Sequence, residues 1–206
     1  MRNFLFAAAA MLVLGGGAAQ ASTVLDATGD FVPGFAGPHD PDLDVVKFSA
    51  TFDGSANFLF SATLAGDINT AAGGLYVIGA DTGAGAIHPF AGLGAPNVTF
   101  DQVILVHQNG AASVGAHALT PTISGNTFSV MVPLAFLPST GFAARDYTFN
   151  LWPRNASNQI SDFAPDNSML SAVPEPATWA TMISGLAMLG VVARRRRRTL
   201  AGLTAA

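Results

Sequence analysis

The chain of 206 residues contains no cysteine, and its charges are few and unevenly placed. Without cysteine no disulfide can stabilise the fold, and no thiolate can bind a metal or act as a nucleophile. Glu175 is the only glutamate, so 12 of the 13 acidic residues are aspartates. Between residues 22 and 172 they face only three basic side chains, Lys47, Arg145 and Arg154, which gives this part a net charge of −9. Such an acidic body lacks the basic surface that nucleic acids require, so we expect no nucleic-acid partner.

Long amphipathic helical periodicity is also missing, and short alternating segments take its place. Alternating apolar residues predict a hairpin of strands 46–52 and 58–64 around the turn Asp53–Asn57, in which aspartate, glycine and asparagine are typical turn residues. Further predicted elements are strands at 75–80, 98–107 and 147–152, a hairpin over 122–132, and one helical turn at 133–137. Many short strands with Gly and Pro turns predict an all-β fold, an antiparallel, jelly-roll-like β-sandwich.

The N-terminus has the order of features of a secretory signal peptide. Arg2 is followed by an apolar run over residues 4–14, which is too short to span a membrane. Ala19 and Ala21 form an A-x-A cleavage site, which predicts Ser22 as the first mature residue. We therefore expect residues 1–21 to form a signal helix that engages the Sec translocon and is removed by signal peptidase.

The C-terminus has the features of a membrane anchor. The turn Pro174, Glu175, Pro176 precedes an apolar segment, 177–193, at the lower length limit of about 17 residues for a transmembrane helix. Five arginines then follow directly: Arg194, Arg195, Arg196, Arg197 and Arg198. Clustered arginine stays cytoplasmic, so we expect residues 199–206 to form a cytoplasmic tail and the body to lie outside.

Residues 173–198 resemble the PEP-CTERM sorting signal, through Pro174-Glu175-Pro176, the pair Trp179-Ala180 and the arginine run. Thr181 and the eight trailing residues depart from the usual pattern. The resemblance implies an exported protein of a Gram-negative bacterium that an exosortase, a membrane transpeptidase, recognises at the Pro-Glu-Pro turn. It further implies inner-membrane anchoring with the body in the periplasm, then release to the surface or medium, in association with exopolysaccharide and biofilm.

The body, residues 22–172, is similar in layout to exported β-sandwich domains of the DOMON and carbohydrate-binding-module kind. An Asp-rich N-terminal loop, the hairpin Asp44–Leu64 and a late strand at 146–152 carry this resemblance. Members of these groups bind sugars, haem or calcium. Only the fold transfers, because no haem ligand pair is present.

Clustered aspartates before the first predicted hairpin suggest a calcium site. Asp40, Asp42 and Asp44 form an Asp-x-Asp-x-Asp run, with Asp26 and Asp30 upstream, and calcium takes six to eight oxygen ligands. An EF-hand is excluded, because Val45 and Thr51 stand where its loop needs Gly and Glu. The alternative is a solvated acidic loop whose aspartates form turns.

Trp152, with Arg154 close by, is the most plausible sugar-contacting group, although a lone Trp at the end of a strand is more often a core anchor. The four histidines show no zinc spacing, and no Gly-x-Ser-x-Gly elbow is present. The sequence thus favours a non-catalytic exported domain that binds polysaccharide or calcium. The alternative is a secreted enzyme acting on extracellular polysaccharide with a pair of aspartates.

Overall fold

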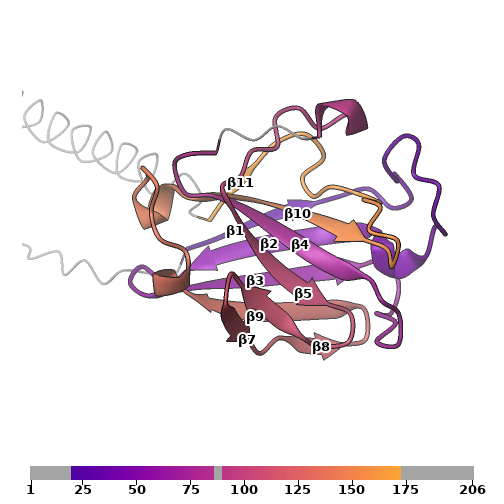
Figure 1. Cartoon of the computed structure of the whole chain (residues 1–206), viewed down its shortest axis with the longest axis horizontal. Helices are drawn as coiled ribbons and strands as arrows, with labels where there is room; N and C mark the ends of the chain where they lie inside the picture. Colours follow the sequence, from indigo (N-terminus) through magenta and orange to yellow (C-terminus); the bar gives the residue numbers. More distant parts are fainter. Residues whose placement is uncertain (1–19, 86–89, 173–206) are drawn as a thin grey trace, which may run out of the picture.

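The computed structural model describes residues 20–85 and 90–172, which form a sandwich of two antiparallel sheets (Figure 1). Sheet A contains, in spatial order, β1 (Gln20–Leu25), β2 (Val45–Phe52), β3 (Asn57–Leu64), β9 (Thr127–Pro133) and β8 (Thr122–Ser124). Sheet B contains β11 (Leu170–Ser171), β10 (Thr148–Arg154), β4 (Leu75–Asp81), β5 (Gln102–His107), β6 (Ala112–Val114) and β7 (His117–Leu119). The all-β prediction is confirmed.

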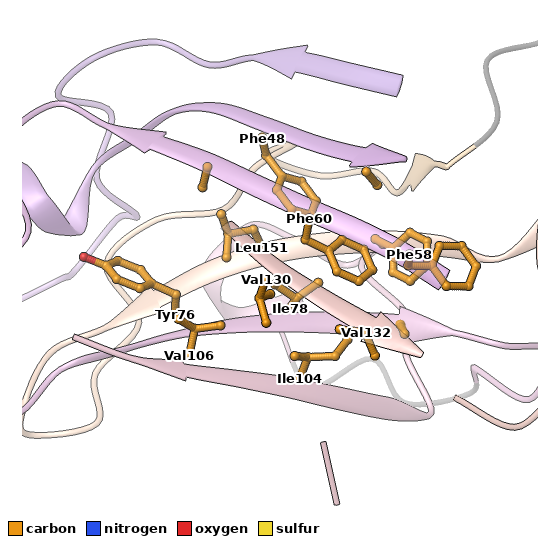
Figure 2. Packing of buried hydrophobic residues seen from close by; sticks show 14 of the residues in the cluster. Phe48, Phe58, Phe60, Tyr76, Ile78, Ile104, Val106, Val130, Val132 and Leu151 are labelled. Atoms are coloured by element: carbon orange, nitrogen blue, oxygen red, sulfur yellow. The ribbon is translucent and has the colours of Figure 1, made fainter. Parts of the chain in front are cut away.

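The main core lies between the two sheets. The inner sides of β2, β3 and β9 contribute every second residue, because the other face of sheet A is open to solvent. Phe58 and Phe60 of β3 lie in this core (Figure 2). Their rings meet that of Phe149 of β10 edge-on, with centroids 5.2 and 4.8 Å apart. Burial of these rings supplies much of the stability that a chain without disulfides needs.

A second core covers the outer face of sheet B. Trp152 of β10 packs there against Phe90, Phe100 and Phe163 from the connecting loops, at centroid distances of 5.0 to 6.3 Å. A Cβ at Gly79 on β4 would lie 2.6 Å from the indole ring, so glycine is what lets the ring lie against the strand. Because both faces are covered, every position of β4 and β10 except the first and last is buried.

Most predicted elements are present, with shifts at their ends. The hairpin over β2 and β3 and the one over β8 and β9 are confirmed, and the predicted turn at 133–137 is the 3-10 helix η3 (Leu134–Phe136). The predicted strand 98–107 begins only at Gln102, because Val98 belongs to the second core. Three further 3-10 turns, η1 (Pro41–Leu43), η2 (Ala91–Leu93) and η4 (Ala144–Asp146), connect strands.

The two ends of the described fold lie close together. Edge strands β1 and β11 contact each other across the sandwich. Gln20 and Ala21 are the first residues of β1 and pair with Phe52 and Thr51, just before the predicted cleavage point. The predicted signal helix and the span 177–193 lie outside the described residues, among which no helix is long and apolar enough to cross a membrane.

Candidate functional site

Five aspartates from three separate segments meet at the end of the sandwich where β1 finishes and β2 begins. Carboxylate oxygens of Asp26, Asp162 and Asp166 lie within 4.8 Å of one another, and so do those of Asp30, Asp44 and Asp162. Asp162 therefore belongs to both groups. We call these five residues the acidic cluster.

Backbone contacts fix the cluster in place. Val45 N donates to Asp162 Oδ2 at 2.8 Å, and Gly29 N donates to Asp44 Oδ2 at 2.7 Å. Ser161 Oγ donates to the carbonyl of Leu43 at 2.7 Å. These bonds hold the segment after β10 against the start of β2, so the carboxylates converge even though they are far apart in sequence.

The surroundings disfavour ionisation of these carboxylates. Burial, followed by repulsion from neighbouring carboxylates, raises the pKa of Asp26 to about 7. Burial raises the pKa of Asp162 to about 8, with Asp26 and Asp30 adding to the effect against two backbone hydrogen bonds. The pKa values of Asp44 and Asp166 are also raised, by burial first and then by Asp30. The nearby charges that shift the pKa values of these groups are all negative, so the neutral, protonated form of each carboxyl is favoured.

Three of the five aspartates predicted to bind calcium, Asp26, Asp30 and Asp44, lie in this cluster, and two do not. Asp40 is exposed. Asp42 is buried, and its Oδ2 accepts bonds from Asn69 N and Gln108 Nε2 at 2.9 and 2.8 Å. The structure thus separates Asp40 and Asp42 from the other three, because the turn η1 carries them away from Asp44 into the wall of an open cavity of about 480 Å³.

Asp162 and Asp166 were missed by sequence reasoning. Val45, which Asp162 contacts, lies 117 positions earlier in the chain, so no local spacing could join them. The available signal was weaker: Asp162 and Asp166 are a second pair of closely spaced aspartates that no basic residue accompanies.

Trp152 is 1% exposed and lies in the second core, so it cannot present its ring to a sugar. The prediction of Trp152 as a stacking platform is wrong, because loops cover the face of sheet B that carries it. Arg154 is partly buried, donates to Asn158 Oδ1 at 2.9 Å, and lines a separate cavity of about 310 Å³ beside Phe35.

The outer face of sheet A is an exposed surface rich in hydroxyl groups. Its middle row crosses all five strands, because the strand registers place these residues opposite one another: Thr23, Ser49, Ser61, Ser129 and Thr122. The flanking rows add further hydroxyls at Thr51, Thr63, Thr127 and Ser124. We call this surface the hydroxyl face.

The hydroxyl face bears one charge and several apolar side chains. Lys47 is its only charged residue. Leu25, Leu59 and Met131 on this face are 76%, 42% and 57% exposed, and Phe142 is the only other large apolar side chain so exposed in the described ranges. Leu59 and Met131 are cross-strand partners and form a small exposed apolar pair, whereas Leu25 lies at the other end of the sheet.

Comparison with known families finds the PEP-CTERM protein-sorting motif at residues 172–198. The motif begins at Ala172, the residue where the described fold ends. The chain thus carries the signal of an exported protein that an exosortase processes. The sorting residues Pro174, Glu175, Pro176, Trp179, Ala180 and Arg194 to Arg198 lie outside the described residues. No curated protein and no solved structure matches the chain.

Proposed function

We propose that the exported domain is a non-catalytic component of the extracellular matrix that contacts neutral polysaccharide through the hydroxyl face. The middle row of five hydroxyls carries this proposal. Each hydroxyl can donate and accept, as sugar hydroxyls do. Neighbouring strands are about 4.8 Å apart, which is close to the length of one pyranose unit in an extended glycan. A chain lying across the strands would meet one protein hydroxyl per sugar.

The charge distribution favours a neutral polymer over an anionic one. The body has a net charge of −9, which repels anionic partners over a distance of about a Debye length. The hydroxyl face itself bears no carboxylate, so a neutral chain can approach without desolvating a negative charge. Leu59 and Met131 offer apolar contact to the C–H faces of sugar rings.

Binding is tested by sedimentation of the full chain, purified in detergent, with the polysaccharide fraction of the producing culture and with insoluble neutral glucan. We expect the protein to sediment with at least one of them. The double variant Ser61→Glu, Ser129→Glu would place two carboxylates beneath the bound sugar. Because these charges would lose water on binding, affinity should fall by about tenfold or more. Thr70→Glu, on an exposed loop outside the hydroxyl face, is the matched control.

Two outcomes would contradict the proposal: retention of the double variant at wild-type levels, or no sedimentation of the wild-type protein with either polymer. Release of soluble reducing ends during the assay would instead support the alternative, a secreted enzyme acting on polysaccharide.

A further inference from the structure

The acidic cluster contains buried oxygen atoms that have no hydrogen-bond donor. Asp44 is 4% exposed, and its Oδ1 has no partner. Asp26 Oδ2 and Asp30 Oδ1 are likewise buried without partners. These three atoms make up half of the six unpartnered buried side-chain atoms found in residues 20–85 and 90–172. An unpaired buried polar atom costs about 1–3 kcal/mol, so such a concentration requires a physical reason.

Hydrogen bonds within the protein do not neutralise the negative charge of the acidic cluster. Asp162 is 1% exposed, and its two oxygens already accept from Val45 N and Phe163 N at 2.8 and 2.7 Å. Backbone amides stabilise a carboxylate but add no positive charge. With five carboxylates so close together, the cluster must take up protons or bind a cation.

We propose that Asp26, Asp30, Asp44, Asp162 and Asp166 form a calcium-binding site that fastens the β1–β2 connection to the segment after β10. The two groups of carboxylates within 4.8 Å share Asp162, and Asp44 of the second group has a buried Oδ1 without a hydrogen-bond partner. The site takes one or two ions, because each group of three offers its own position.

The donor set selects calcium among common cations. All ligands are carboxylate oxygens, which suit hard cations and disfavour zinc or copper. Calcium accepts six to eight oxygens in irregular geometry, including bidentate carboxylates, whereas magnesium needs near-ideal octahedra and keeps its own waters. Asp166 is exposed, so water can complete the shell from that side. Affinity in the range of extracellular modules, about 10⁻⁴ to 10⁻³ M, is expected.

The site does not depend on polysaccharide contact, because the cluster lies at one end of the sandwich and none of its residues belongs to the hydroxyl face. The calcium site and the polysaccharide contact can therefore be tested independently, and a negative result for one does not contradict the other.

Thermal unfolding of the full chain in detergent tests the site, with 10 mM calcium chloride, 10 mM magnesium chloride or chelator. Calcium should raise the Tm by about 3–10 °C over chelator, as expected for ligand at about ten to one hundred times its Kd. Magnesium should raise it far less. Isothermal titration with calcium chloride should give one or two ions per chain.

The substitution Asp30→Asn separates loss of a ligand from general destabilisation. It removes one proposed calcium ligand and also the repulsion between Asp30 and the other carboxylates of the cluster. In chelator its Tm should equal or exceed that of the wild type, and calcium should then add little. Asp166→Asn, at the exposed rim, repeats the test without disturbing a buried group. Asp146→Asn, an exposed aspartate in η4, should keep the full calcium response.

An equal response to magnesium, an undiminished calcium response in both Asp30→Asn and Asp166→Asn, or no calcium response in the wild type would overturn the proposal.

Discussion

Asp162 occupies the centre of the acidic cluster, because it belongs to both groups of carboxylates and anchors the start of β2. Its place in the cluster was not predictable, since Asp26, Asp30 and Asp44 lie in the first quarter of the sequence. Asp26, Asp30 and Asp44 were predictable, because clustered aspartates without basic neighbours are visible in the sequence itself. Asp40 and Asp42 belong to the same run in the sequence but lie outside the cluster, because the turn η1 separates them from Asp44 and Asp42 accepts from Gln108 Nε2.

The raised pKa values of the aspartates in the acidic cluster determine how the stability of the domain depends on pH. Burial raises the pKa of Asp26 to about 7 and that of Asp162 to about 8, from an ordinary value of 3.8. In chelator the folded state therefore binds more protons than the unfolded state between about pH 4 and 8. The free energy of unfolding should rise as pH falls from 8 to 5. Asp53 and Asp101, whose pKa values are lowered, oppose this only below about pH 4.

Urea unfolding in chelator at pH 5, 6.5 and 8 measures this trend. Asp26→Asn should make this trend shallower, because the substitution removes one of the carboxyl groups whose pKa is raised. A stability in chelator that is lowest at pH 5 would show that the cluster is ionised without a cation.

Among the elements, strands were predictable where pairing is local and their sequence alternates. β2, β3, β8 and β9 form hairpins whose turn residues and period of two are visible in the sequence. β1 and β11 were missed: β1 pairs across a long loop, and β11 has only two residues. Trp152 was misjudged for a related reason, because the loops that cover sheet B show no periodic pattern.

The contact between β3 and β10 gives a prediction for the core. Phe149 is 0% exposed and packs edge-on against Phe58 and Phe60. Phe149→Ala should lower the free energy of unfolding by about 3–5 kcal/mol, because it leaves a cavity between the sheets. Phe142→Ala, at a ring that is 41% exposed, should change it by less than about 1 kcal/mol. Chemical denaturation of both variants checks the difference, and equal losses would contradict this assignment of the core.

For the whole molecule, the boundary between fold and sorting signal leads to a prediction about processing. The PEP-CTERM motif starts at Ala172, directly after β11, so cleavage near Pro174-Glu175-Pro176 would leave every described strand intact. We expect mass spectrometry of the protein outside the cells to find no peptide containing Arg194 to Arg198. Replacing Pro174 and Pro176 with alanine should retain the protein in the membrane fraction. Recovery of the intact arginine run from the medium would refute this.

The adjacency of β1 and β11 has a consequence for where the two ends of the described fold lie. Leu170 pairs with Phe149, which packs on Phe58, and Phe58 lies opposite Phe52, the partner of Gln20. Both ends of the described fold therefore lie at one pole of the domain, and the acidic cluster lies at the other. A cation held at the proposed site would thus be separated by the length of the sandwich from Ala172, where the sorting motif begins.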